Sequence, residues 1–166
     1  MRPAPLLAFI TALLIVTGGP AFAGEMRWQG WDAGLASAKA NKRYILVDVY
    51  TDWCGWCKRM DKDVYARDDV SDYLEKHFVS VKLNAESNQA MSYQGEARTA
   101  RGIASGFRVN SYPTTIFLAP GGEHLTNVPG YVPADRFLLL LRYIGDGHME
   151  KGVAWPDYVA RAGAAK

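Results

Sequence analysis

The chain has 166 residues, a length that fits one domain rather than several. Hydrophobic residues make up 49% of it and charged residues 22%, which is the balance of a soluble globular protein. The net charge of +2, without any block of Lys and Arg, argues against a nucleic-acid partner and says little about other partners.

The N-terminus has the pattern of an export signal. After a positive start, residues 6–16 form an apolar run, and residues 21–23 (Ala-Phe-Ala) offer the small residues that signal peptidase reads. The apolar run is short against the roughly 20 residues of a membrane-spanning helix. We therefore expect a signal peptide at 1–23, cleaved after Ala23, and one domain at 24–166 that is periplasmic or secreted. A neighbouring cut site and retention as a membrane anchor are the alternatives.

The first half of the mature chain alternates helix and strand signals. The run Tyr44-Ile-Leu-Val-Asp-Val-Tyr50 is nearly continuous in β-branched and aromatic residues, as expected of a buried strand. It leads directly into the first cysteine, after which a helix should begin. The elements expected in this half are a helix over 28–42 opening at Asp32, a strand over 44–50, a helix from 55 to about 65, a helix near 69–77 and a strand over 78–83.

The second half has shorter elements separated by turn signals. Pro120-Gly121-Gly122 indicates a turn, so the strand before it should return as an antiparallel strand after it. We expect a loop over 84–93, a helix over 96–105, strands over 114–118 and 123–130, a helix over 133–144 that starts with Pro and ends at Gly, and a short terminal helix over 153–162. This order predicts an α/β fold with a central mixed β-sheet and helices on both of its faces.

The chain has two cysteines, Cys54 and Cys57, in the motif Cys-Gly-Trp-Cys. A disulfide between them closes too small a loop to stabilise the fold much, so a structural staple is a poor explanation. Structural zinc is disfavoured, because the three His are scattered singly and no second Cys or His pair exists. Copper(I) bound by two thiolates remains open. A redox role is favoured.

Four segments, in this order, resemble landmarks of the thioredoxin family. They are the active-site strand and turn at Ile45–Lys58, the next strand at Val81–Asn84, the cis-proline segment at Ser111–Leu118, and the hairpin at Gly121–Glu123 with its end at Gly130. The match spans roughly residues 44–144. It departs from thioredoxin at Trp56, where thioredoxin has Pro, and over 84–113, which is longer. The resemblance implies a thioredoxin fold and a thiol:disulfide oxidoreductase closer to the exported thiol reductases than to cytosolic thioredoxin.

The two cysteines are expected to divide the reaction between them. Cys54 lies at the first turn of the predicted helix, where free backbone N–H groups and the helix dipole favour the thiolate. Cys57, one turn deeper, should be shielded. Attack by Cys54 on a substrate disulfide makes a mixed disulfide, which Cys57 then resolves with release of the reduced product.

Asp48 interrupts an otherwise apolar strand, where a carboxylate is costly unless it is paired or protonated. The resemblance places Asp48 beneath the dithiol and Lys82 beside it on the adjoining strand. It leads to the hypothesis that Asp48 takes the proton from Cys57 as that thiol attacks. The alternative is that Asp48 faces solvent or caps a backbone group.

Residues around the dithiol are expected to contact the substrate: Trp53, Gly55, Trp56, Tyr112 and Pro113. Gly55 allows a partner backbone to come close, whereas the two Trp residues favour packing or contact over chemistry. A proline inside a strand signal belongs at an edge or bend. The resemblance implies a cis Tyr112–Pro113 bond that presents the Tyr112 backbone to an incoming peptide strand; an ordinary trans turn is the alternative.

We expect a protein-disulfide reductase. The Gly55-Trp56 pair brings no charge to the dithiol, and Asp48 and Asp52 place negative charge nearby, so the couple should be reducing. The implied partners are disulfide-containing exported proteins and a membrane thiol-transporting electron donor. We expect a monomer, with no cofactor and no bound metal. A disulfide-installing oxidase and a copper or thiol carrier of thioredoxin fold are the alternatives.

Overall fold

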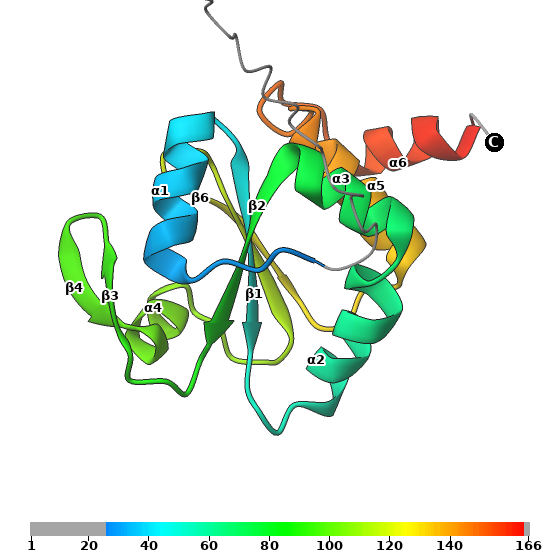
Figure 1. Cartoon of the computed structure of the whole chain (residues 1–166). Coiled ribbons are helices and arrows are strands. Elements are labelled where there is room, and N and C mark those ends of the chain that lie inside the picture. Colours follow the sequence, from blue (N-terminus) through cyan, green and yellow to red (C-terminus); the bar gives the residue numbers. More distant parts are fainter. Residues whose placement is uncertain (1–25, 165–166) are drawn as a thin grey trace, which may run out of the picture.

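The computed structural model describes residues 26–164, so the expected signal peptide lies outside the described residues. Every helix in that range is too short or too polar to cross a membrane. A four-stranded sheet in the order β2-β1-β5-β6 forms the centre (Figure 1). Its strands are β1 (Tyr44–Tyr50), β2 (Phe78–Asn84), β5 (Thr114–Leu118) and β6 (His124–Pro129). β1 pairs in parallel with β2 and antiparallel with β5, and β6 is antiparallel to β5, so the predicted mixed sheet is confirmed.

The position of β1 explains its sequence. It lies between β2 and β5, and its five inner residues, including Asp48, are all buried. A strand covered on both faces has no solvent side, so its residues show no alternation of polar and apolar types. β1 has the bounds that its sequence predicts, and Asp48 is the polar exception within it.

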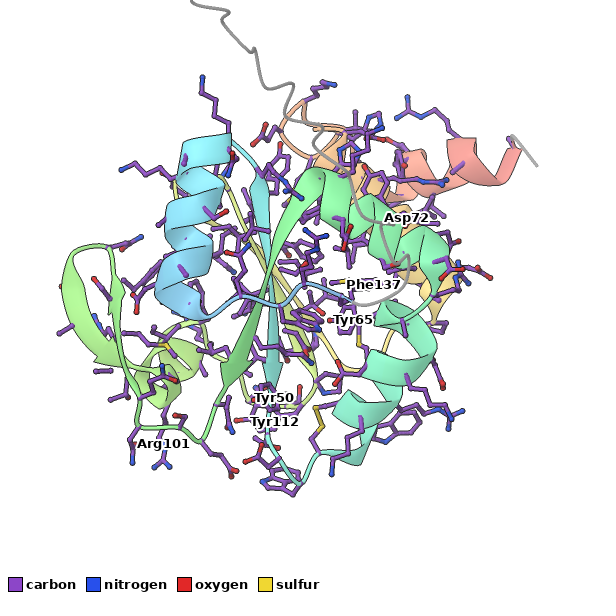
Figure 2. All side chains as sticks on the ribbon, in the orientation of Figure 1. Tyr50, Tyr65, Asp72, Arg101, Tyr112 and Phe137 are labelled. Carbon is purple, nitrogen blue, oxygen red and sulfur yellow. A yellow bond between two sulfur atoms is a disulfide. The ribbon has the colours of Figure 1, made fainter. Side chains whose placement is uncertain are left out.

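Helices cover both faces of the sheet, and two apolar clusters fill the space beneath them. One cluster lies under α1 (Trp31–Asn41) and α4 (Ala100–Gly106). The other lies under α2 (Gly55–Met60), the π-helical turn η1 (Asp61–Tyr65), α3 (Asp68–His77) and α5 (Ala134–Gly145), with α6 (Trp155–Ala164) packed on α5. Figure 2 shows Tyr65 and Phe137 within this second cluster, where their rings meet edge to face with centroids 5.5 Å apart.

The predicted helices are present, with ends shifted by a few residues, except in the segment that is longer than in thioredoxin. There, residues 84–93 do not form only a loop, and residues 96–105 are not helical throughout. The chain instead forms a hairpin of β3 (Ala90–Tyr93) and β4 (Glu96–Thr99), and the helix begins only at Ala100. Gln94 and Gly95 form the two-residue turn with positive φ angles of 53° and 81°.

A long-range anchor on α1 explains the hairpin. The Trp31 indole N–H donates to the backbone oxygen of Ser92 at 2.9 Å, and a carboxylate oxygen of Asp32 accepts from the Ser92 N–H at 2.8 Å. These bonds hold β3 from a helix some sixty positions earlier in the chain. The segment is polar, which predicts a loop. Its sequence contains no local signal for the contacts with α1, so the hairpin could not be predicted from it.

Candidate active site

The dithiol lies at the junction between β1 and α2. Cys54 is the residue that caps the N-terminus of α2, and its sulfur accepts a hydrogen bond from the Cys57 N–H at 3.0 Å. The two cysteines form a disulfide with their Cα atoms 5.3 Å apart, and each residue is only 3% exposed. The N–H that points at the Cys54 sulfur, together with the helix dipole, would stabilise a thiolate there once the disulfide is reduced.

A row of polar side chains crosses three strands on the face covered by α2 and η1. Strand register pairs Asp48 with Lys82 on β2 and with Thr115 on β5. Asp48 is 1% exposed, and its Oδ2 lies 2.5 Å from the Lys82 Nζ. Asp48 is therefore an internal, ion-paired carboxylate, which excludes the alternative that it faces solvent.

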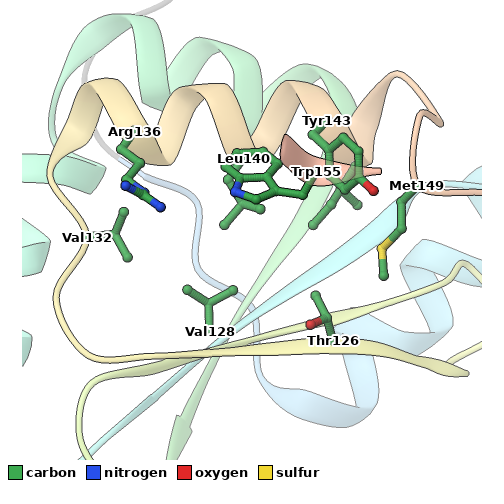
Figure 3. A pocket seen from close by; sticks show the side chains of 9 residues that line it. Thr126, Val128, Val132, Arg136, Leu140, Tyr143, Met149 and Trp155 are labelled. Atoms are coloured by element: carbon green, nitrogen blue, oxygen red, sulfur yellow. The ribbon is translucent and has the colours of Figure 1, made fainter. Parts of the chain in front are cut away.

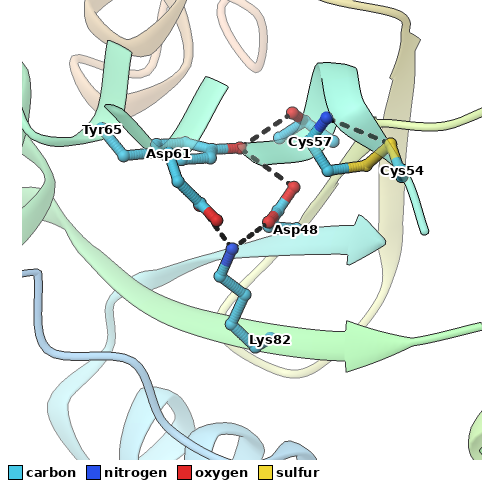
Figure 4. Close-up of polar contacts among 7 residues, drawn as sticks. Asp48, Cys54, Cys57, Asp61, Tyr65 and Lys82 are labelled. Carbon is cyan, nitrogen blue, oxygen red and sulfur yellow. Dashed lines mark hydrogen bonds and ion pairs between the residues drawn. A yellow bond between two sulfur atoms is a disulfide. The ribbon is translucent and has the colours of Figure 1, made fainter. Parts of the chain in front are cut away.

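Lys82 has a second carboxylate partner in Asp61, the first residue of η1. The Lys82 Nζ lies 2.5 Å from the Asp61 Oδ1, so one ammonium joins two carboxylates (Figure 4). The same Nζ lies 4.5 Å from the ring centroid of Trp28 and 5.2 Å from that of Tyr50. Aromatic faces and carboxylates thus surround this cation, which holds it in place beside Asp48.

Burial and charge act in opposite directions on this cluster. Burial raises the pKa of Asp48 above its ordinary value, although Lys82 pulls that pKa down and Asp61 pushes it further up. Burial lowers the pKa of Lys82, but the attraction of Asp48 and Asp61 outweighs it, so the net pKa of Lys82 is raised. Lys82 therefore stays charged, while Asp48 is a carboxylate that binds a proton more readily than an exposed one.

Tyr65 covers the cluster from η1. Its hydroxyl lies 3.4 Å from the Asp48 Oδ1 and 3.3 Å from the Thr115 Oγ1 (Figure 4). Burial and the negative charge of Asp48 raise the pKa of Tyr65 well above its ordinary value. Tyr65 therefore remains a neutral hydroxyl that donates toward Asp48.

The surface around the dithiol is aromatic. Trp53 and Trp56 are 68% and 56% exposed. The Trp53 ring meets the Tyr112 ring edge to face at a centroid distance of 5.9 Å, and the Trp56 ring lies 5.5 Å from that of Tyr131. The Tyr112–Pro113 bond is cis, as the resemblance implies. The contact between Trp53 and Tyr112 brings this segment to the residue next to Cys54.

The remaining predicted contact, Gly55, lies in open space. A Cβ built on it would have no heavy atom within 4 Å, so a partner backbone could come close at this point. The structure thus brings Cys54, Cys57, Asp48 and Lys82 into one site, with the five predicted contact residues around it.

Sequence reasoning missed several residues of this site: Asp61, Tyr65, Glu86 and Tyr131. Asp61 carries a usable signal, because it follows Cys57 by four positions on the same helical run and so lies on the same helix face. Glu86 accepts the Trp53 indole N–H at 3.0 Å, and Tyr131 contacts Trp56 from beyond β6. Nothing local in the sequence connects these two residues with the dithiol.

Two further features bear on other kinds of ligand. Among residues 26–164, no three His, Cys, Asp or Glu side chains gather closely enough to hold a metal ion. An apolar pocket of about 320 Å³ lies between β6, α5 and α6, with Val128, Leu140 and Trp155 on its walls and Arg136 at one end (Figure 3). None of the predicted site residues lines that pocket, so the dithiol site is separate from it.

Comparisons with known proteins agree with this geometry. Residues 31–145 match the model of the thioredoxin-like domain. The chain is 32% identical over 109 residues to the thiol:disulfide interchange protein DsbD 2 of Pseudomonas aeruginosa, a match that covers 64% of this chain and 17% of that protein. The chain thus corresponds to less than a fifth of that relative's length.

Solved structures show the same fold. A thioredoxin-fold protein from Helicobacter pylori superposes with a TM-score of 0.61 at 24% identity, covering 80% of this chain and 92% of that one. A thioredoxin from Thermus thermophilus superposes with a TM-score of 0.58 at 27% identity, covering 74% of this chain and 95% of that one.

Proposed function

The chain belongs to the thioredoxin-like family, and from this premise we propose that it is a thiol:disulfide oxidoreductase that reduces disulfides in exported proteins. The observation that carries the proposal is the buried Asp48, paired with Lys82 and through it with Asp61, beneath a disulfide at the start of α2. A purely structural cystine does not require a buried carboxylate that accepts protons readily. A dithiol that must lose and regain protons requires such a group.

The reaction uses each cysteine once. The Cys54 thiolate attacks one sulfur of the substrate disulfide, which forms a mixed disulfide and releases the first substrate thiolate. The Cys57 thiol passes its proton to Asp48 and attacks the Cys54 sulfur. The mixed disulfide breaks, the second substrate thiolate leaves, and the Cys54–Cys57 disulfide forms. Two electrons pass from the dithiol to the substrate, whose thiolates take up protons from water.

The geometry suits Asp48 to the role of base and Lys82 to a positioning role. An ordinary carboxylate is a weak base toward a thiol, and the raised pKa of Asp48 reduces that mismatch. Lys82 balances the carboxylate charge when Asp48 is ionised and, held by Asp61, keeps the ion pair aligned along the strand register. Tyr65 limits the freedom of Asp48 from the other side.

Charge supports the reducing direction. Two carboxylates share one ammonium, so the cluster carries excess negative charge when both are ionised. The Gly55-Trp56 pair adds no cation, and the nearby Arg59 already pairs with Asp63 at 3.0 Å. Negative charge near the dithiol disfavours the thiolate and so disfavours the reduced form, which makes the dithiol a better electron donor.

We further propose that the chain works in the periplasm or outside the cell as a monomer after removal of residues 1–23. A reductant in an oxidising compartment needs a supply of electrons. The likeness to the DsbD proteins, which are named for thiol:disulfide interchange, supports a membrane thiol-transporting donor.

The reduction potential of the Cys54/Cys57 couple tests this function. Equilibration in glutathione buffers, followed by the fluorescence of Trp53 and Trp56, should give a potential nearer the roughly −270 mV of thioredoxin than the roughly −120 mV of strong oxidants. A value clearly above about −180 mV would reverse the direction and make the protein an oxidase. Tight copper(I) binding by the reduced protein, without turnover on any disulfide, would support the carrier alternative instead.

A further inference from the structure

A groove of about 340 Å³ is lined by α4, by the chain that follows it and by Ala85 after β2. Tyr112, the residue before the cis proline, also lines it, and the Tyr112 ring contacts Trp53, which adjoins Cys54. Figure 2 shows Arg101 and Tyr112 at the same end of the molecule. The groove therefore opens onto the surface where a substrate chain would lie when its disulfide meets Cys54.

The groove is basic. Arg101 and Arg108 line it, both are exposed, and neither forms an ion pair with any residue between 26 and 164. Asn110 and Ser105 add neutral polar groups. Glu86 accepts the Trp53 indole N–H through its carboxylate and a guanidinium N–H of Arg101 through its backbone oxygen, and Glu96 pairs with Arg98. Within residues 26–164, no carboxylate pairs with either guanidinium, so both can bind an anionic group in the groove.

The backbone at Arg108 is consistent with a role for its side chain. Arg108 follows the C-terminus of α4 with φ at +57°, and its N–H donates to the Ser105 oxygen at 2.9 Å. Glycine is the usual residue in this left-handed conformation after a helix, because other residues adopt it at a cost. At this position Arg108 adds a cation to the lining of the groove, in spite of the conformational cost.

We propose that this basic groove, formed by Arg101, Arg108 and Tyr112, selects substrates that carry an Asp or Glu close to the disulfide being reduced. The proposal rests on the reductase function above and names the class of substrate that the site prefers. A peptide strand that pairs with the Tyr112 backbone would place side chains on alternate sides, and those on the α4 side would meet the two arginines. Exposed cations that attract a carboxylate act on encounter and docking rather than on the chemical step.

The test uses the reduced, mature protein and peptides that contain one intramolecular disulfide. The peptides share one sequence and differ only in Glu, Gln or Lys at the positions that flank the cysteines. Stopped-flow tryptophan fluorescence gives the rate of each reduction at low and high salt. We expect the Glu peptide to react about fivefold faster than the Lys peptide at low salt, with a ratio that shrinks as salt screens the charges.

Variants separate this preference from folding. Arg101→Gln with Arg108→Gln should remove the preference, and Arg108→Glu should reverse it. The matched control is Arg161→Gln, which removes an exposed arginine from α6 and should keep the preference. At saturating peptide the limiting rate should be the same in the unmodified protein and its three variants. Only the peptide concentration that gives half of that rate should change. The uncharged bis(2-hydroxyethyl) disulfide should be reduced equally by all of them, which a merely structural role of the arginines would not predict.

Two results overturn the proposal. Equal rates with the Glu and Lys peptides in the unmodified protein would show that the groove reads no charge, although reduction itself would stand. A preference that survives the double arginine variant would assign it to other residues. If the protein reduced none of the peptides and did not reduce bis(2-hydroxyethyl) disulfide either, the proposed function would be wrong, and this inference with it.

Discussion

The cluster beneath the dithiol and the β3–β4 hairpin both depend on contacts between distant parts of the chain, but the two regions use different physics. The cluster joins the buried Asp48 to the partly exposed Lys82 and Asp61 by short ion pairs. The hairpin is held to α1 through Ser92 by two hydrogen bonds, one partly buried at Trp31 and one exposed at Asp32. A buried charge interacts strongly with its charged neighbours, whereas a hydrogen bond that replaces a bond to water gives a small net gain.

This difference indicates a division of roles. Changes in the Asp48–Lys82–Asp61 cluster should alter proton transfer and redox chemistry, and changes in the hairpin should alter local stability alone. Substitutions in each region test this division of roles.

The two Cys→Ser variants should differ in whether they accumulate mixed disulfides with the substrate. Because Cys54 caps α2 and Cys57 lies within the helix, Cys57→Ser should accumulate mixed disulfides through Cys54, and Cys54→Ser should accumulate almost none. Either change should lower turnover by on the order of 10³-fold or more. Non-reducing gels of protein mixed with a disulfide substrate give the measurement. Equal trapping by the two variants would contradict the assigned roles.

Asp48→Asn should slow resolution of the mixed disulfide by about 100-fold, the usual scale of a lost general base. The same change should raise Tm at pH 7 by about 4 °C, which corresponds to about 1 kcal/mol in a domain of this size. Burial raises the pKa of Asp48, so the folded protein loses stability as the pH rises above the ordinary Asp value of 3.8 and the group ionises. Asn cannot ionise, so the variant should lack this loss.

The control for Asp48→Asn is Asp72→Asn, which removes an exposed carboxylate from α3 (Figure 2). Stopped-flow kinetics and thermal melts between pH 4 and pH 8 would measure both effects. Unchanged resolution in Asp48→Asn would exclude the base role, and a lower Tm would show that the Lys82 pairing contributes more than the burial of the charge costs.

Lys82→Met and Asp61→Asn should shift the acid limb of the pH–rate profile in opposite directions. Lys82 lowers the pKa of Asp48, so its removal should move the limb to higher pH. Asp61 raises the pKa of Asp48, so its removal should move the limb to lower pH. Turnover near the limb should change several-fold in each case.

Exposed residues outside the cluster supply the controls for this pair. Lys62→Met on η1 and Asp72→Asn on α3 make the same changes in side chain, and their profiles should follow that of the unmodified protein. Shifts in the same direction for Lys82→Met and Asp61→Asn would mean that neither residue acts on Asp48 by charge.

The smallest effect is expected in the hairpin. Asp32→Ala removes the acceptor of the Ser92 N–H and should lower the free energy of unfolding by about 1 kcal/mol. Amide hydrogen exchange should become faster in β3 and β4, while the reduction potential stays the same. A change in potential would show that the hairpin is coupled to the dithiol, and the proposed division of roles would then fail.

Much of the fold follows from local patterns. The buried strand β1, the turn at Gly121 and the helix after Cys54 each have a signal within a few residues, because side-chain periodicity and turn chemistry act over short distances. The CxxC motif and the cis-proline segment locate the dithiol and its substrate face through a resemblance to a known family. The Asp48–Lys82 pair also follows from that resemblance, because the two adjoining strands carry it.

Other features required the tertiary structure. Asp61, on the turn that continues α2, meets Lys82 on the distant strand β2, and Ser92 meets Asp32 because the hairpin folds back on α1. The groove beside Tyr112 likewise forms where α4, the end of β2 and the cis-proline segment come together. Local sequence patterns predict most of the elements, but not the β3–β4 hairpin, and they identify the two cysteines that carry the redox chemistry. Which charges meet depends on the tertiary structure, because an ion pair or hydrogen bond between distant residues requires a strand register and a helix placement that no local pattern contains.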